Sequence, residues 1–92
     1  MDLQLDDKIA LVSGAGGGIG ASIAATLVEH GCTVYVADCD VAAANKVAAK
    51  FNGRGHPLTL DVGNADEARA AVERIVIECG RIDIVVNNAG IL

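Results

Sequence analysis

The chain has 92 residues, enough for one small domain and too few for a nucleotide site together with a separate substrate domain. Its formal net charge is -5 and it has no cluster of Lys and Arg, which argues against nucleic-acid and membrane partners. Hydrophobic residues make up 52% of the sequence and aromatic residues only 2%, so we expect a closely packed aliphatic core.

The first predicted strand is an aliphatic run over residues 9–12, which leads into a cluster of glycines. The segment after the glycines has helical periodicity, with Ile19, Ile23 and Leu27 on one face, and it stops at Gly31. The residues before this strand are polar, without an apolar run of signal-peptide or membrane-spanning length. A strand, a glycine turn and a helix are therefore predicted, in a protein that we expect to be cytoplasmic.

The same unit repeats in the next segment. A second strand over residues 33–37 ends at Asp38, and the helix after it continues until Asn52-Gly53 breaks the pattern. Its apolar residues recur at helical spacing: Ala44, Val47, Ala48 and Phe51. A third, weaker strand is predicted over residues 57–60, and its proline is easiest to accommodate in an edge strand.

The last helix and strand have the clearest signals. Asn64 is a suitable N-cap, Glu67 follows three residues later as in a capping box, and Gly80 ends the helix. The apolar stripe of this helix consists of Ala68, Ala71, Val72, Ile75 and Cys79. The aliphatic run over residues 82–86 is typical of a strand covered on both faces.

Four strands joined by three helices, with right-handed crossovers, predict a parallel sheet in the order 3-2-1-4. This is an α/β, half-Rossmann three-layer fold, and we expect it to form one domain over residues 1–92. Ligands of such folds bind at the carboxyl ends of the strands. The glycine turn, Asp38 and Asp61 all follow strand ends, so they are the candidate site.

The glycine turn over residues 13–20 reads Ser-Gly-Ala-Gly-Gly-Gly-Ile-Gly. Glycine permits positive φ and lets a pyrophosphate approach the start of a helix, where free N–H groups and the helix dipole favour negative charge. Gly20 would allow close packing of the helix against the sheet. No Gly-Lys-Ser/Thr follows, which excludes a nucleoside triphosphate P-loop, and a merely flexible glycine-rich loop is the alternative interpretation.

Asp38 ends the second strand about 20 residues after the glycines. At this position a carboxylate can accept hydrogen bonds from both ribose hydroxyls of an adenosine, and it would repel a 2′-phosphate. Neither the glycine turn nor Cys39 supplies a basic side chain, so NAD is favoured over NADP. Asp61 and Val62, after the third strand, could meet the adenine ring. Alternatively, Asp38 could begin a helix beside Asp40, and Asp61 could be a simple turn residue.

These segments resemble the short-chain dehydrogenase/reductase family in order and spacing over essentially the whole chain. The segment from Ser13 to Gly20 is similar to the family's T-G-x-x-x-G-x-G turn, Asp61-Val62 to its adenine pair, and Asn87-Asn88-Ala89-Gly90 to its N-N-A-G signature. The Ser13 hydroxyl, in place of the usual Thr, could tie the turn to the strand end near Asn88. The resemblance implies a site for NAD. Its pyrophosphate would be bound by Gly14, Gly18, Ile19 and Gly20, its adenosine ribose by Asp38, and its adenine by Asp61 and Val62. The cofactor cleft would be lined by Asn88, Ala89 and Gly90.

The family's catalytic Tyr-x-x-x-Lys, its Ser and its helical Asn all come after the N-N-A-G strand, and these 92 residues do not include them. Tyr35 is followed four positions later by Cys39 rather than Lys, so we interpret Tyr35 as a core residue. His30 and His56 are interpreted as solvated or capping, and the three cysteines, without a C-x-x-C pair, as idle thiols rather than a disulfide framework or zinc site. We assign no catalytic or metal-binding residue, and we expect no dehydrogenase turnover by this chain alone.

Two other functions stay open at this point. An S-adenosylmethionine-dependent methyltransferase also uses a glycine turn and an acid after the second strand, but Val12-Ser13 stands where that family has an acidic residue. A self-associating structural module with a vestigial cleft is the alternative from a different class.

In the family the fourth strand is central, so we expect a homo-oligomer formed through the exposed edge of the strand over residues 82–87.

Overall fold

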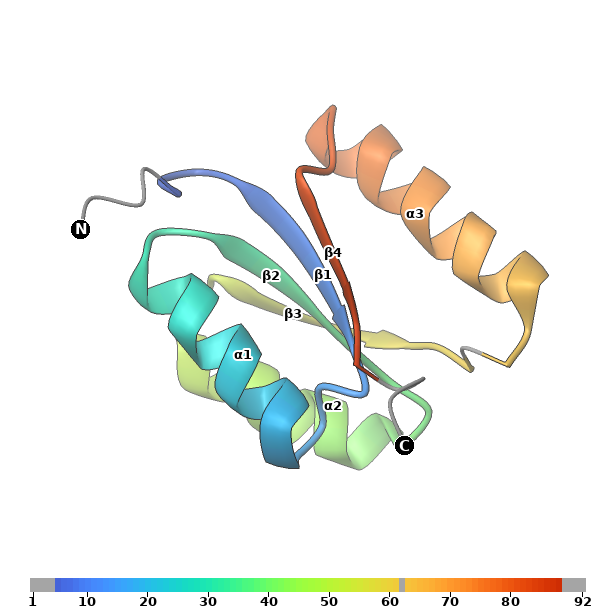
Figure 1. The fold of residues 1–92 in the computed structure, drawn as a ribbon, viewed down its shortest axis with the longest axis horizontal. Helices are drawn as coiled ribbons and strands as arrows, with labels where there is room; N and C mark the ends of the chain where they lie inside the picture. The colour runs from blue at the N-terminus through green and yellow to red at the C-terminus, as the bar shows by residue number, and fades with distance from the viewer. Residues whose placement is uncertain (1–4, 62, 89–92) are drawn as a thin grey trace.

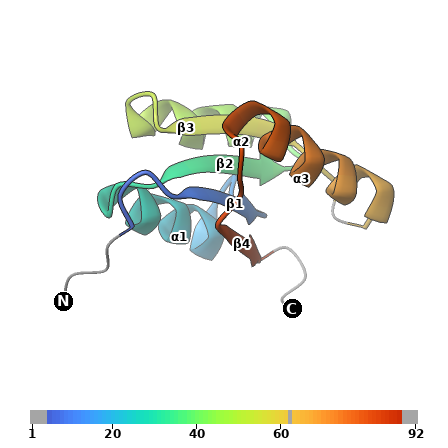
Figure 2. The same ribbon diagram turned by 90° about the horizontal axis from the view of Figure 1, so that it is seen from above.

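The computed structural model describes residues 5–61 and 63–88, which form four parallel strands and three α-helices (Figure 1). In chain order the elements are β1 (Ile9–Ser13), α1 (Gly18–Glu29), β2 (Thr33–Asp38), α2 (Val41–Ala48), the short 3-10 helix η1 (Ala49–Phe51), β3 (Gly55–Thr59), α3 (Ala65–Cys79) and β4 (Ile84–Asn87). The strands lie in the order β3-β2-β1-β4, which Figure 2 shows from above. The predicted half-Rossmann topology is thus confirmed.

The sheet is the middle layer of three, with α1 and α2 on one face and α3 on the other (Figure 1). Successive strand residues point to opposite faces, so β1 sends Val12 toward α1 and α2 and Leu11 toward α3. The predicted apolar residues of α2 and η1 are buried in the first of these cores. Tyr35 on β2 belongs to the second.

The ends of α3 follow the sequence signals, with one difference. The Asn64 side-chain oxygen accepts the backbone N–H groups of Asp66 at 3.1 Å and Glu67 at 3.2 Å, and Gly80 ends the helix with a φ of 82°. The Glu67 carboxylate does not return to the cap as a capping box requires. It accepts the N–H of Asp61 at 3.4 Å instead, so it braces the strand end before the helix.

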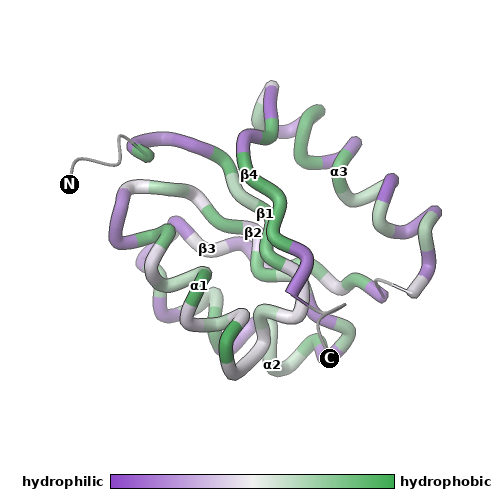
Figure 3. The backbone as a smooth tube through the Cα atoms, in the orientation of Figure 1, coloured by the Kyte–Doolittle hydropathy of each residue, from purple (hydrophilic) through white to green (hydrophobic). Residues whose placement is uncertain are grey.

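The two edges of the sheet are β3 and β4. Pro57 lies within β3, and an edge strand tolerates a proline because one side of it needs no ladder hydrogen bond. β4 has the aliphatic run typical of a strand covered on both faces, but in the described sheet it is an open edge, as we expected for the strand over residues 82–87. β4 pairs with β1 alone in the described sheet, and its Val85 side chain is 59% exposed although the strand is strongly hydrophobic (Figure 3).

Candidate functional site

The carboxyl end of β1 bends into α1 through the glycine turn. Gly14 has a φ of 65° and Gly18 a φ of 57°, conformations that side-chain-bearing residues rarely adopt. Between them, the N–H of Ala15 donates to the carbonyl of Ala37 at 3.0 Å and so extends the contact between β1 and β2. Two of the three predicted phosphate-site glycines are therefore required by the backbone path.

Gly20 lies in the first turn of α1 against the backbone of the glycine turn. A Cβ on Gly20 would overlap the Gly14 carbonyl oxygen and stand 2.8 Å from the Asn88 amide nitrogen. That nitrogen donates to the same Gly14 carbonyl at 3.3 Å. The close approach that we predicted for Gly20 is confirmed, but its neighbour is the turn rather than the body of the sheet.

The ends of β1 and β4 are joined by side chains. The Ser13 hydroxyl lies within hydrogen-bonding distance of the Asn87 side-chain oxygen at 3.1 Å and of the Val86 carbonyl at 3.3 Å. The predicted tie between the turn and the neighbouring strand is present, through Asn87. Asn88 adds a second tie through Gly14, so the end of β4 supports the glycine turn on two sides.

The start of α1 has N–H groups without a protein side-chain acceptor. Among the helices that the structure describes, α2 is capped by Asp40 and α3 by Asn64, whereas Gly17 at the start of α1 makes no side-chain cap and no acidic residue lies in the first turn. The first N–H groups of any α-helix lack partners inside the helix. With the positive end of the helix dipole, they form a place for an anion.

Asp38 stands at the end of β2, beside the glycine turn. Its carboxylate accepts the N–H of Gly16 at 2.9 Å and the N–H of Asp40 at 2.9 Å. The Asp40 N–H, and after it the Gly16 N–H, lower the pKa of Asp38 below its ordinary value, and partial burial offsets this only in part. Asp38 is therefore a carboxylate at neutral pH, next to the turn that would hold the phosphates. Asp40, not Asp38, is the N-cap of α2.

Asp61 lies at the carboxyl end of β3 and is exposed. Its side chain accepts the N–H of Gly63 at 2.9 Å, a local turn of the kind that the alternative interpretation expected. The neighbouring Leu60 N–H donates to the Asp38 carbonyl at 3.1 Å, which brings the ends of β2 and β3 together. Val62, Ala89 and Gly90, which we also predicted as site residues, lie outside the described residues.

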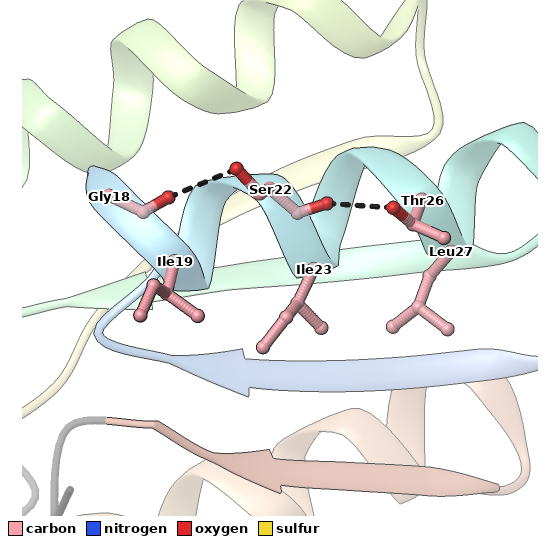
Figure 4. A pocket seen from close by; sticks show the side chains of 6 residues that line it. All are labelled: Gly18, Ile19, Ser22, Ile23, Thr26 and Leu27. Carbon is pink, nitrogen blue, oxygen red and sulfur yellow. Dashed lines mark hydrogen bonds between the residues drawn. The ribbon is translucent and has the colours of Figure 1, made fainter.

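Ile19, the remaining predicted site residue, belongs to an apolar row on α1. Ile19, Ile23 and Leu27 project from one side of the helix, as Figure 4 shows. Together with Gly18, Ser22 and Thr26 they line an open pocket of about 590 Å³. The buried residues of α1 are Gly20 and Ala24 instead, and Ile19 is 73% exposed. The predicted face exists, but only part of it packs against the core.

Tyr35 and His30, which we excluded from the site, lie away from it. Tyr35 is 5% exposed and donates to the Glu78 carboxylate at 2.9 Å, and burial, with Cys79 and Glu78 beside it, raises the pKa of its phenol. The His30 ring lies 2.8 Å from the Thr26 carbonyl at the end of α1. Over the described ranges no group of three or more His, Cys, Asp or Glu side chains could hold a metal ion, and no helix is long and apolar enough to span a membrane.

The structure thus brings four parts of the site to one edge of the sheet: the glycine turn, Asp38, Asn88, and the segment that leads into Asp61. Sequence reasoning missed the contact of Gly16 with Asp38 and that of Glu67 with Asp61. The glycine cluster and the capping-box spacing drew attention to these segments. Nothing in either pattern indicates the partner. Gly16 and Asp38 come from separate loops, and Asp61 and Glu67 come from a strand end and the first turn of α3.

Comparisons with known proteins agree with this geometry. A family model described as short chain dehydrogenase matches residues 8–92. D-threitol dehydrogenase of Mycolicibacterium smegmatis is 41% identical over 93 residues, which cover 98% of this chain and 36% of that enzyme. The chain therefore spans about a third of the length of this curated relative.

Solved structures give the same result. A hydroxysteroid dehydrogenase from Escherichia coli superposes with a TM-score of 0.89 at 37% identity, over 97% of this chain and 38% of that one. A 3-ketoacyl-(acyl-carrier-protein) reductase from Brucella melitensis, solved with NADH, superposes with a TM-score of 0.83 at 32% identity, over 89% of this chain and 34% of that one.

Proposed function

Because the chain belongs to the short-chain dehydrogenase family, we propose that its 92 residues form the site for the adenosine and pyrophosphate portion of NAD in an oxidoreductase. The observation that carries this proposal is the uncapped start of α1 directly after the glycine turn, with the Asp38 carboxylate beside it. The reductase solved with NADH supports the same class of ligand. When bound, the nicotinamide of NAD would supply the hydride chemistry.

Each predicted residue has a place in this proposal. The N–H groups at the start of α1, around Gly18, Ile19 and Gly20, would face the pyrophosphate, and the bend at Gly14 would let it approach. The Asp38 carboxylate would accept hydrogen bonds from the ribose hydroxyls. The remaining members, at the adenine ring and along the cleft, would be Asp61, Val62, Asn88, Ala89 and Gly90.

We expect NAD to bind more tightly than NADP. The 2′-phosphate of NADP would stand against the ionised Asp38 carboxylate, and the neighbouring Cys39 offers no positive charge. Isothermal titration should give an affinity for NADP at least about tenfold weaker, a difference of ~1.4 kcal/mol. Asp38→Ala should shrink this ratio.

The control for this measurement is Asp40→Asn. It removes the same charge two residues away, keeps a residue suited to capping α2, and should leave the ratio unchanged. Equal or better binding of NADP by the unmutated chain would refute the role given to Asp38. Tighter binding of S-adenosylmethionine than of NAD would contradict the proposed cofactor.

We further propose that two copies of this chain associate through β4. The strand pairs on one side only in the described sheet, and its exposed Val85 is an apolar side chain on an open edge. Antiparallel pairing of two such edges about a twofold axis would join two four-stranded sheets into one. Burying the aliphatic surface would stabilise the association by about 25 cal/mol for each Å² of apolar area removed from water.

Val85→Lys should convert the oligomer into a monomer and lower its melting temperature. The charge would lie at the new interface, where it has no partner. Light scattering across a dilution series measures the mass. Ile77→Lys, a change of the same kind on the outer side of α3, should leave the mass as it is. A folded monomer at every concentration of the unmutated chain would contradict the association.

A further inference from the structure

The Asp38 side chain connects two loops of the site. Its Oδ2 accepts the N–H of Gly16, in the turn between β1 and α1, and its Oδ1 accepts the N–H of Asp40, at the start of α2. Gly16 and Asp38 are 22 positions apart in sequence, so this is a tertiary contact rather than a local turn. Through its backbone carbonyl, Asp38 also receives the N–H of Leu60 after β3.

The contact with Asp38 leaves no space for a side chain at Gly16. A Cβ there would stand 2.7 Å from the Asp38 carboxylate and 2.7 Å from the Ala43 side chain on α2. Gly16 is not among the glycines with positive φ, so its backbone conformation does not demand glycine. Glycine is required because the Asp38 carboxylate and α2 occupy the space that a side chain would need. Any side chain at position 16 would push Asp38 away from the turn.

We propose that Asp38 is a positioning residue for the phosphate-binding turn, in addition to the ribose contact that the proposed function gives it. A carboxylate has about four lone-pair positions, so two N–H groups leave room for the ribose hydroxyls. With the turn held against β2 in advance, less ordering is required when the pyrophosphate binds. One side chain thereby sets the spacing between the phosphate and ribose parts of the site.

The first test measures the turn without a ligand. Asp38→Asn keeps the size of the side chain but leaves one acceptor oxygen for two N–H donors, because the amide nitrogen cannot accept. The Gly16 amide proton should then exchange with solvent about tenfold faster, measured by nuclear magnetic resonance. Asp40→Asn removes the same charge and keeps the α2 cap, so it should leave Gly16 exchange unchanged.

The second test separates positioning from ribose recognition. Calorimetric titration compares ADP with 2′,3′-dideoxy-ADP, which has the pyrophosphate and adenine but no ribose hydroxyls at these positions. Asp38→Asn should weaken both ligands, the dideoxy compound by about tenfold, because the turn is no longer held. A residue that acted on the ribose alone would weaken ADP and leave the dideoxy compound unaffected.

A second variant removes the contact without changing a charge. Gly16→Ala should displace the Asp38 carboxylate and weaken dideoxy-ADP as Asp38→Asn does. Unchanged Gly16 exchange in Asp38→Asn, or unchanged dideoxy-ADP affinity, would overturn the positioning role. If no adenine nucleotide binds the unmutated chain, the proposed function fails, whereas Gly16 exchange still decides whether Asp38 holds the turn.

Discussion

Gly20→Ala should abolish NAD binding and lower the melting temperature. The added methyl group would overlap the Gly14 carbonyl, a backbone atom that cannot rotate away, and crowd the Asn88 amide. Overpacking at tightly packed positions costs about 1–3 kcal/mol. Here the strain falls on the contact that joins the glycine turn, the start of α1 and the end of β4. Thermal unfolding and calorimetric titration of NAD measure the two effects.

Gly17→Ala is the matched control for stability. It adds the same methyl group three residues earlier, where a Cβ meets no atom within 4 Å and where the backbone φ of 179° suits any residue. Its melting temperature should lie close to that of the unmutated chain. If Gly20→Ala were as stable as Gly17→Ala and still bound NAD, the close approach of α1 to Gly14 would not constrain the site.

Ile75→Ala should destabilise the chain by about 2–5 kcal/mol, the range for truncating a fully buried aliphatic side chain. Ile75 is 0% exposed, and it and Ala71 are the buried residues of α3. Because α3 alone covers its face of the sheet in the described structure, losing this side chain uncovers Leu11 and Leu60 as well. For a small domain the melting temperature should fall by about 10 °C or more.

Ile77→Ala makes the same truncation two residues later on the same helix. Its side chain is 83% exposed, so the loss should stay within about 0.5 kcal/mol. Chemical denaturation of both variants gives the difference directly. Equal stability of the two would mean that α3 is not held on the sheet by Ile75.

Most of the fold could be predicted because the chain repeats one pattern. The helical spacing of Ala44, Val47 and Ala48 corresponds to burial against the sheet, and Asn64 and Gly80 mark the ends of α3. β4 was different. A continuous aliphatic run indicates which neighbours a strand can pack against, but not whether they are present. The exposed edge at Val85 was expected from the resemblance to a family in which this strand is central, and not from the run itself.

The candidate site was predictable in position and less so in detail. Parallel strands end at the same edge of a sheet, so Asp38 and the glycine turn had to come close once the strand order was known. The individual hydrogen bonds depend on backbone paths of separate loops. The bond between Asp38 and Gly16 is of this kind, and glycine itself carries no side-chain signal for it.

The pairing of the last strand with the first has a consequence for how the chain folds. Gly14 and Asn88, which meet at the glycine turn, are 74 positions apart. β2 can pair with β1 early, but the turn is complete only after the whole intervening chain has closed its loop. Such long-range closure slows folding. We therefore expect nucleotide binding to appear late in refolding, after β1, β2 and the helix α1 between them have formed.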